Sequence, residues 1–364
     1  MHETDTLAEA RRLMTICNAC RYCEGLCAVF PAMEMRRAFP DGDLDYLANL
    51  CHGCGACYID CQFAPPHEFD VNVPKVFAEL RAESYARYVW PSAFGIVFRR
   101  NGLVIGLIFA ACITAFTAAF YLVAGAQDFF SAHIGDGAFY EIMPHDVMAG
   151  LFGGVFVLAC AALAIGQRKF SRRAAAPLKA SMTTFWQASK NAASLRYLDG
   201  GGAGCYHSEA ARGDYRRIFH HFTFYGFLLC FASTCVATVY HYAFRWEAPY
   251  AWNEAPVILG TLGGFGLIVG PLGLLNEKRF RDPSVSSEES NGMDVAFLMA
   301  LLLTAATGLA LLFLRNTPLM SLLLAIHLGA VLGFFLTLPY GKFVHGLYRF
   351  AALMRYAREQ SETH

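Results

Sequence analysis

The sequence contains few charged residues. Only 16% of its 364 residues are Asp, Glu, Lys or Arg, whereas 56% are hydrophobic, and a typical soluble domain carries about 25% charged residues. The chain also has no excess of positive or negative charge, because 29 basic residues balance 29 acidic ones. The balance argues against a nucleic-acid partner, and the scarcity of charge indicates a membrane protein.

The N-terminus lacks the apolar stretch of a secretory signal peptide, since the chain begins with MHETDTLAEARRLM. We therefore expect the segment that follows to stay in the cytoplasm. In that compartment, clustered cysteines are more often metal or cluster ligands than disulfide partners.

Six segments contain no charged residue, and each is close to the roughly 20 residues that cross a bilayer. They are Leu103–Ala124, Val147–Gly166, Phe222–Tyr240, Pro256–Leu275, Val295–Leu314 and Leu319–Leu338. A soluble protein would need interleaved amphipathic helices to cover such segments, and the sequence shows none. We therefore expect six transmembrane helices in a lipid bilayer.

Basic residues gather in alternate connections between these segments. The 125–146 connection contains no Lys or Arg, whereas the 167–217 connection contains ten. Because positively charged loops stay in the cytoplasm, we expect both termini on the cytoplasmic side of the cell inner (cytoplasmic) membrane.

Eight of the 13 cysteines form two runs with the spacing C-x2-C-x2-C-x3-C, namely CNACRYCEGLC (17–27) and CHGCGACYIDC (51–61). In two-cluster ferredoxins the fourth cysteine of each run ligates the other cluster. The expected ligands are Cys17, Cys20, Cys23 and Cys61 for a first [4Fe–4S] cluster, and Cys51, Cys54, Cys57 and Cys27 for a second. Structural zinc would also use eight cysteines, but zinc sites favour C-x2-C pairs separated by a spacer.

The expected fold is therefore mainly α-helical. A small two-cluster ferredoxin-like domain occupies residues 1–84, and an interfacial linker follows at 85–102. A six-helix membrane domain covers 103–356 and includes the cytoplasmic 167–217 loop. A short cytoplasmic tail ends the chain at 357–364.

Histidines near the membrane segments are candidate haem ligands, because ionisable residues in a membrane are rare and usually functional. His327 and His345 are 18 residues apart, which is five helical turns, about 27 Å, and the same helix face. Pro339 lies between them and can kink such a helix.

The third membrane helix places His220 at its cytoplasmic end and His241 at its outer end. Matching the two helices by depth pairs His220 with His345 and His241 with His327. Two such pairs suit one or two b-type haems with imidazole on both axial positions. The alternative ligands are His221 in place of His220, and His145 in place of His241.

No dinucleotide-binding motif is readable in the chain. The glycines of YLDGGGAGC (197–205) follow no predicted strand, and those of GTLGGFG (260–266) lie inside an apolar run, where glycines favour helix packing. A flavin would therefore belong to a partner protein. Cys205 and His207 are candidate contacts to that partner or to a quinone. The simpler alternative is that they belong to a loop with no binding role.

Four segments in this order, CNACRYCEGLC, CHGCGACYIDC, LRYLDGGGAGC and HHFTFYGF, resemble the tricarballylate-utilization protein B family, also called citrate-utilization protein B. The resemblance covers nearly the whole chain. It implies an electron-transfer protein that accepts electrons from a reduced cytoplasmic FAD-dependent dehydrogenase of tricarballylate and passes them to membrane quinone.

The segment LPYGKFVHGLYRF (338–350) resembles the last helix of the respiratory nitrate reductase membrane subunit. In that family two histidines 18 residues apart bind two b haems. This second resemblance covers one helix, and it implies haem ligation by His327 and His345.

Two alternatives remain, one from another functional class and one a closely related redox protein. One is a six-helix tricarboxylate transporter with a cytoplasmic zinc domain, but transporters usually show internal repeats and intramembrane charges, and neither is evident. The other is a heterodisulfide-reductase-like redox subunit, which the conventional cluster spacing supports poorly. We expect an electron-transfer subunit with no organic-substrate site of its own.

Overall fold

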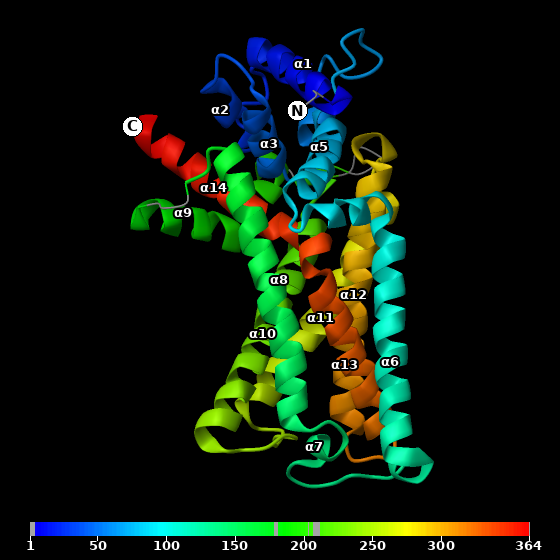
Figure 1. Cartoon of the computed structure of the whole chain (residues 1–364). Helices are drawn as coiled ribbons and strands as arrows, with labels where there is room; N and C mark the ends of the chain where they lie inside the picture. The colour runs from blue at the N-terminus through cyan, green and yellow to red at the C-terminus, as the bar shows by residue number, and fades with distance from the viewer. Residues whose placement is uncertain (1–3, 178–180, 203, 207–211, 364) are drawn as a thin grey trace.

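The computed structural model describes residues 4–177, 181–202, 204–206 and 212–363. The described chain is mainly helical, and short helices of the N-terminal region form a cap on one end of a bundle of long helices (Figure 1). Both ends of the chain lie at the capped end (Figure 1).

Five helices form the cap. They are α1 (Asp5–Cys20), α2 (Val29–Glu34), α3 (Asp41–Leu50), α4 (Ala56–Ile59) and α5 (Val73–Tyr88). Helix α1 begins at an N-terminal cap, because the Thr4 hydroxyl accepts a hydrogen bond from the Leu7 N–H at 3.3 Å. The apolar sides of these helices bury Leu13, Leu47 and Phe77 completely, so the cap has a core of its own.

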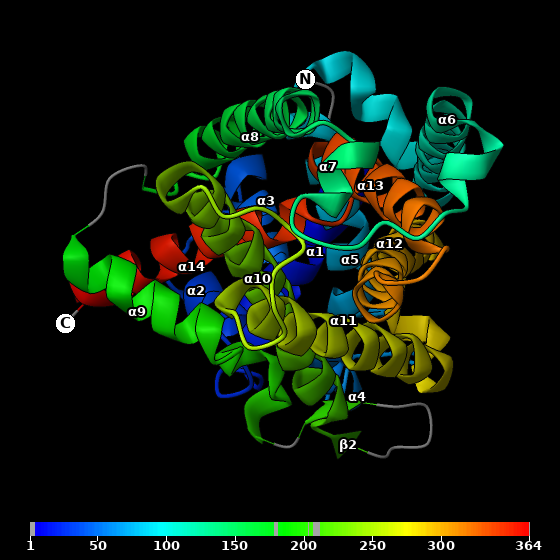
Figure 2. The same cartoon turned by 90° about the horizontal axis from the view of Figure 1, so that it is seen from below.

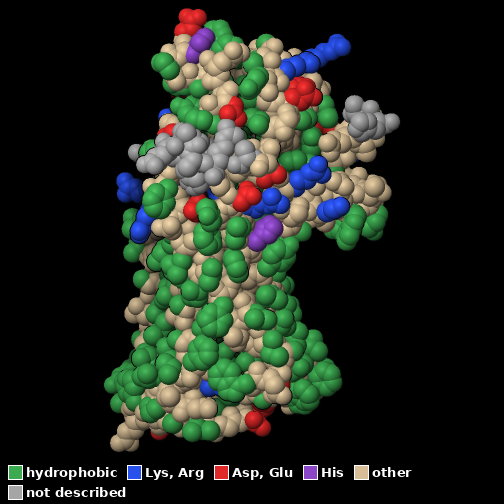
Figure 3. All heavy atoms as spheres, turned by 180° about the vertical axis from the view of Figure 1, so that it is seen from behind, with side chains coloured by type: hydrophobic (Ala, Val, Ile, Leu, Met, Phe, Trp, Pro, Cys, Tyr) green, Lys and Arg blue, Asp and Glu red, His purple; other side chains and the backbone are tan. Residues whose placement is uncertain are grey.

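Among the residues that the structure describes, six stretches are long and apolar enough to cross a membrane, and each contains one of the runs predicted from the sequence, wholly or nearly so. They are Ser92–Phe129, His145–Arg173, Tyr215–Phe244, Ala255–Phe280, Ser290–Leu314 and Met320–Tyr340. Their helices are α6 (Asn101–Phe129), α8 (His145–Arg173), α10 (Tyr215–Val239), α11 (Ala255–Phe280), α12 (Glu288–Leu314) and α13 (Met320–Thr337). On the face seen from behind, hydrophobic side chains cover most of the bundle, whereas most charged ones gather toward the cap (Figure 3).

Shorter elements connect the long helices. They are η1 (Ser92–Arg100), α7 (Ala138–Ile142), α9 (Met182–Ala193), η2 (Arg196–Leu198), η3 (Gly200–Gly202), the π-helical η4 (Tyr240–Phe244), η5 (Pro283–Val285), η6 (Leu338–Tyr340) and the C-terminal α14 (Val344–Thr363). Two two-residue strands, β1 (Cys205–Tyr206) and β2 (Arg212–Gly213), pair antiparallel.

Glycines allow α10 and α11 to pack closely, and both figures show these helices side by side (Figures 1 and 2). A Cβ atom at Gly226 would lie 3.0 Å from the Gly263 carbonyl oxygen, and one at Gly263 would lie 2.7 Å from the Cys230 nitrogen. Gly263 belongs to the GTLGGFG segment, so this segment serves helix packing.

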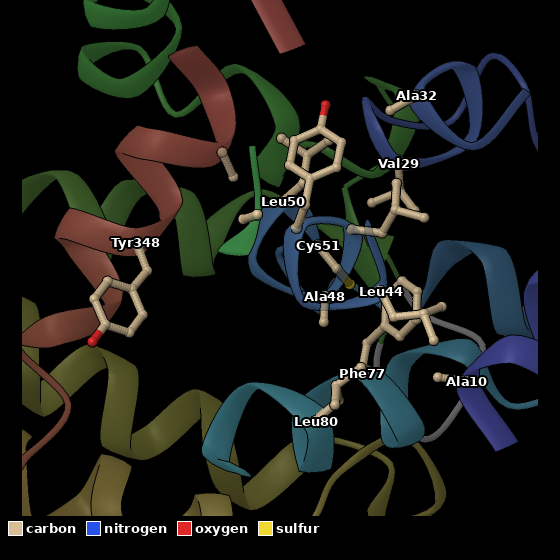
Figure 4. Close-up of a cluster of buried hydrophobic side chains, with 14 of the residues drawn as sticks. Ala10, Val29, Ala32, Leu44, Ala48, Leu50, Cys51, Phe77, Leu80 and Tyr348 are labelled. Atoms are coloured by element: carbon tan, nitrogen blue, oxygen red, sulfur yellow. The ribbon is translucent and has the colours of Figure 1, made fainter. Parts of the chain in front are cut away.

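The cap and the bundle share one buried core. The ring of Tyr348 on α14 stacks on Phe170 of α8, with centroids 4.6 Å apart and planes 3° apart. Figure 4 shows Tyr348 in the same buried cluster as Leu50, Cys51 and Phe77 of the cap. This shared core fixes the second cysteine run relative to the long helices.

The helix expected to carry both His327 and His345 is interrupted. Helix α13 ends at Thr337, the turn η6 contains Pro339, and α14 begins only at Val344. Proline cannot donate to the helical hydrogen-bond ladder, and Gly341 is extended (φ −143°). The expectation of one continuous helix through this region is therefore wrong, and α14 turns across the bundle end toward the cap (Figure 1).

Candidate functional site

The first cysteine run surrounds the end of α1. Cys17 and Cys20 lie in its last turn, and Arg21 ends the helix in the left-handed conformation (φ 58°), with its N–H donating to the Cys17 carbonyl at 2.8 Å. This C-terminal cap reverses the chain. As a result, Cys23 and Cys27 follow in a turn and not on the helix.

The second cysteine run follows α3. Cys51 is the first residue after the helix, and Gly53 and Gly55 take left-handed conformations (φ 61° and 84°) that favour glycine. A Cβ atom at Gly53 would lie 3.4 Å from a terminal nitrogen of Arg281, which is an ordinary contact distance, so the backbone conformation and not a lack of space favours glycine there. Cys57 then lies on the short helix α4.

The eight cysteines of the two runs line two neighbouring cavities. The first is lined by Cys17, Cys20, Cys23 and Cys61, the second by Cys27, Cys51 and Cys54, and Cys57 borders both. Cys61 of the second run thus joins the first cavity, and Cys27 of the first run joins the second. This is the grouping that the exchanged-ligand scheme requires, whereas ligation itself stays a prediction.

Much of the remaining lining is apolar, as at Phe30 and Val73, which border both cavities. Within the described residues, no three His, Cys, Asp or Glu side chains converge in the manner of ligands to a single metal ion. The thiols instead surround a space on several sides. An all-thiol donor set suits a soft centre such as an iron–sulfur cluster, so the residues present fit that group.

Burial controls the protonation of the thiols. It raises the pKa of Cys17 and of Cys23 to about 12, and neighbouring cysteines of the same cavity contribute to both shifts. In the second cavity, burial raises the pKa of Cys54 to about 11, and Cys205 adds to the shift. Without a metal these thiols keep their protons at neutral pH, so metal binding must release protons.

Four arginines from separate elements hold the loop of the second run. Arg81 of α5 donates to the Ala48 carbonyl at 2.9 Å and to the Cys51 carbonyl at 3.0 Å. Arg349 of α14 donates to the same Cys51 carbonyl at 2.9 Å. The loop is thereby tied both to the cap and to the C-terminal helix.

The other two arginines bind the next carbonyls of this loop. Arg216 of α10 donates to the His52 carbonyl at 3.2 Å and to the Gly53 carbonyl at 2.8 Å. Arg281, the first residue after α11, donates to the same Gly53 carbonyl at 2.9 Å. Burial and the neighbouring arginines lower the pKa of Arg281 and of Arg349 to about 10.

Positive charge is therefore unbalanced beside the second cavity. None of the four arginines forms an ion pair with a carboxylate in the part of the chain that the structure describes. A buried charge is costly unless it is paired. The arginine group defined here, Arg81, Arg216, Arg281 and Arg349, thus suits an anionic group in the second cavity.

The structure brings the predicted inner histidine pair together. The rings of His220 on α10 and His345 on α14 have centroids 6.3 Å apart and planes 72° apart. The His345 Nδ1 atom contacts the Lys342 carbonyl, which leaves Nε2 for another partner, and the buried His220 Nδ1 has no hydrogen-bond partner among the described residues. Two facing imidazoles, one oriented by a backbone carbonyl, fit axial ligation of a haem.

The predicted outer pair is not brought together. His241, in η4, stacks on His145 with centroids 3.5 Å apart and planes 15° apart. His327 instead contacts the Thr307 hydroxyl through Nδ1 at 3.1 Å. Its ring also fills the space beside Gly308, where a Cβ atom would lie 2.9 Å from it. His327 therefore packs against α12, and His145, the alternative ligand, is the neighbour of His241.

Of the remaining candidates, His221 packs its ring against Tyr225, with centroids 5.8 Å apart, and makes no ring contact with His345 among the described residues. Cys205 is buried next to Cys54 of the second cavity, so it offers no surface to a partner. His207 lies outside the described residues.

The arginine group was not predicted from the sequence. A signal for two of its members was present, because Arg216 precedes His220 by four residues and Arg349 follows His345 by four. At this spacing each arginine shares a helix face with its histidine. Arg81 and Arg281 carry no comparable pattern, since only the fold brings them to the loop.

Comparisons with known proteins agree with this organisation. A family model described as citrate utilization protein B matches residues 97–364, and one described as the Fer4-like domain of citrate utilization protein B matches residues 10–87. An Escherichia coli protein named citrate utilization protein B is 50% identical over 358 residues, which is 98% of this chain and 93% of the relative. No solved structure matches. The chain therefore belongs to the citrate utilization protein B family.

Proposed function

We propose that this chain is a membrane electron-transfer protein that takes electrons from a reduced flavoprotein through two [4Fe–4S] clusters and b haem to the quinone pool. The observation that carries the proposal is the position of the second thiol-lined cavity, whose loop is bonded to the helices that bear His220 and His345. When bound, the clusters and haem supply one-electron carriers between a two-electron donor and a two-electron acceptor.

The residues that line the two cavities differ in exposure, which supports a direction of transfer. Beside the first cavity, Tyr22 is 71% exposed and Gln62 is also exposed. At the second cavity, Cys51, His52 and Gly53 are buried. We therefore propose that the flavoprotein docks at the first cavity and that electrons leave through the second.

The chain's own residues have separate roles in this proposal. The eight cysteines of the two runs hold the clusters, and the arginine group holds the second loop against the long helices. His220 and His345 hold the inner haem, and the Lys342 carbonyl orients the His345 ring. A quinone would accept the electrons within the bilayer.

An outer haem has two candidate histidine pairs, and both contain His241. His145 lies beside His241, but rings stacked with centroids 3.5 Å apart leave no space for an iron between them, so an outer haem on this pair would require the two rings to separate. The contact between His327 and Thr307 gives His327 a structural role in helix packing. The sequence-based pair of His241 and His327 remains the alternative.

We further propose that the protein lies in the cell inner (cytoplasmic) membrane with both termini in the cytoplasm. Both ends of the chain lie at the capped end, where charged side chains gather (Figures 1 and 3). Helix α9, which belongs to the basic 167–217 connection, lies at the same end (Figure 1), and such connections stay in the cytoplasm.

The substrate of the partner follows from resemblance alone. The Escherichia coli relative is named for citrate utilization, and the family resemblance implies a tricarballylate dehydrogenase as donor. We propose that a cytoplasmic FAD-dependent dehydrogenase oxidises a tricarboxylate and reduces this chain, which turns over no organic substrate itself.

Metal analysis of anaerobically purified protein tests the proposal. We expect non-haem iron and acid-labile sulfide in equal amounts, and reduction of a quinone analogue when the flavoprotein and tricarballylate are added. Cys20→Ala should abolish quinone reduction, whereas Cys112→Ala, on a membrane helix, should retain it. Zinc without sulfide would refute the redox function and favour the transporter with a zinc domain.

A further inference from the structure

We propose that α9 is an in-plane anchor that binds the lipid headgroup region beside the capped ends of the long helices. This inference rests on the membrane placement proposed above and not on any cofactor. The ligand is the lipid surface itself, with a preference for anionic headgroups.

Helix α9 has two opposite faces. Thr184, Ala188 and Asn191 are buried and attach the helix to the protein. Met182 and Trp186 are 79% and 70% exposed, and at about 100° per residue they point away from the buried face. The helix therefore presents apolar side chains outward.

Phe185 extends this apolar face to the edge of the protein. Its side chain is 47% exposed, and its ring also meets Phe350 of α14, with centroids 5.8 Å apart. We call Met182, Phe185 and Trp186 the α9 apolar face. A soluble protein seldom leaves such residues together in water.

Two hydrogen bonds place the end of α9 at the border of the apolar zone. Arg217 of α10 donates to the Ser194 carbonyl at 3.1 Å, and the Tyr225 hydroxyl donates to the Ala193 carbonyl at 2.9 Å. The uncharged run of α10 begins at Phe222, between these two donors. The end of α9 is thus level with the start of the predicted membrane segment.

The orientation of α9 suits a helix in the membrane plane. It lies across the direction of the long helices and projects sideways from them (Figure 1). From behind, the projecting part forms a shelf with hydrophobic side chains on the edge that faces the bundle's apolar zone (Figure 3). An in-plane amphipathic helix buries its apolar face at the boundary of headgroups and acyl chains.

A second element, η1, lies at the same height along the bundle as α9, on another side of it (Figure 1). The segment leading into α6 is also horizontal in Figure 1 and at the height of α9. Its Phe94 and Ile96 are 47% and 67% exposed, and Arg99 and Arg100, at its end, are exposed as well. Two separate elements therefore define one interfacial plane.

The charges near α9 favour lipid over other occupants. Lys190 of α9 and Arg196 of η2 are exposed, and basic side chains at this level attract anionic headgroups. Tryptophan is also enriched at membrane–water interfaces. Since α9 packs on α14, which carries His345, the lipid surface would brace the helix of the inner histidine pair.

Fluorescence of Trp186 tests the proposal directly. A variant with Trp90→Phe, Trp246→Phe and Trp252→Phe keeps Trp186 as its single tryptophan. It is reconstituted into vesicles of phosphatidylcholine and phosphatidylglycerol that contain lipids brominated either near the headgroup or deep in the chains. We expect about a twofold loss of emission with the shallow bromines, less with the deep ones, and weak quenching by aqueous acrylamide.

A matched control places the tryptophan on the cap. Adding Tyr22→Trp to a background in which Trp186→Phe also removes the α9 tryptophan creates a reporter that acrylamide should quench and brominated lipids should not. A Trp186 that acrylamide alone quenches lies in water, and one that neither agent quenches is covered by protein, such as a second copy. Either result would overturn the proposal for α9 while leaving the membrane placement intact. Protein that fails to float with the vesicles would refute the membrane placement itself.

Discussion

Arg216 on α10 and Arg349 on α14 donate hydrogen bonds to adjacent carbonyls of one loop. Arg216 reaches the His52 carbonyl at 3.2 Å, and Arg349 reaches the Cys51 carbonyl at 2.9 Å. Two helices that are distant in sequence thereby hold the same cysteine run. The second thiol-lined cavity cannot move relative to the bundle without breaking these bonds.

The same two arginines lie one helical turn from the inner histidine pair. Arg216 precedes His220 on α10, and Arg349 follows His345 on α14. The contacts of the loop and the approach of the two imidazoles therefore depend on one packing arrangement. This coupling makes the arginines the first residues to test.

Neutralising one of these arginines should lower the reduction potential of the cluster proposed for the second cavity. A nearby cation favours the more negative, reduced form of a cluster. For Arg216→Gln or Arg349→Gln we expect roughly a tenfold shift of the one-electron equilibrium toward the oxidised form, about 59 mV. Potentiometric titration followed by electron paramagnetic resonance measures the shift.

The control for this experiment is Arg12→Gln, because Arg12 is exposed and pairs with Glu9 on α1. It should leave both cluster potentials unchanged. An equal shift of both clusters in the Arg216→Gln protein would contradict a specific effect on the second cavity.

The exchanged-ligand scheme predicts which cysteine variants share a phenotype. Cys61→Ala should damage the same cluster as Cys20→Ala, because both residues line the first cavity. Cys27→Ala should damage the same cluster as Cys54→Ala, because both line the second. Iron content and the separate resonance signals of the two clusters measure the effects. A Cys61→Ala protein that loses the second cluster and keeps the first would overturn the scheme.

The haem ligands can be assigned by removing histidines one at a time. His220→Ala and His345→Ala should each remove the same low-spin b-type signal from a reduced-minus-oxidised spectrum, since both imidazoles face one site. At the outer end, His145→Ala should share the phenotype of His241→Ala, and His327→Ala should keep both signals.

Two outcomes would contradict the haem proposal at different points. Loss of the outer signal in the His327→Ala protein alone would restore the pair expected from sequence. The second outcome is protein, purified from haem-producing cells, that has complete clusters but no haem signal. It would show that haem takes no part in electron transfer, and the histidines would then be structural or quinone-site residues.

Protein stripped of clusters should lose stability at alkaline pH. Burial raises the pKa of Cys17 and of Cys23 to about 12, from an ordinary value of 9.0. Because the folded pKa is the higher one, the stabilising contribution of these thiols is complete below pH 9 and is lost as pH rises toward 12. Urea unfolding of the cluster-free chain at several pH values measures the loss.

A double variant isolates the thiols from lysine and tyrosine titration in the same range. Cys17→Ser combined with Cys23→Ser removes both titrating groups from the first cavity. Its unfolding midpoint should fall less steeply above pH 9 than that of the parent. Identical slopes in the two proteins would show that these thiols do not carry the pH dependence.

Local patterns in the sequence determined much of this molecule. Uncharged runs of bilayer length predicted six helices, because the apolar length that can cross a membrane depends only on residues close together in the chain. The fixed spacing of the two cysteine runs likewise predicted which thiols share a cavity. The order of the motifs indicated the family before any fold was known.

Tertiary structure decided what depends on contacts between distant segments. Helical phase placed His327 and His345 on one face, but the turn at Pro339 ends α13 and directs α14 across the bundle. Helical phase also could not predict which histidine lies beside His241. That neighbour, His145, is on α8, and the position of α8 relative to α10 depends on the packing of several helices. The convergence of Arg81 and Arg281 on one loop has no local signature either, since residues so far apart in sequence meet only when the cap packs on the bundle.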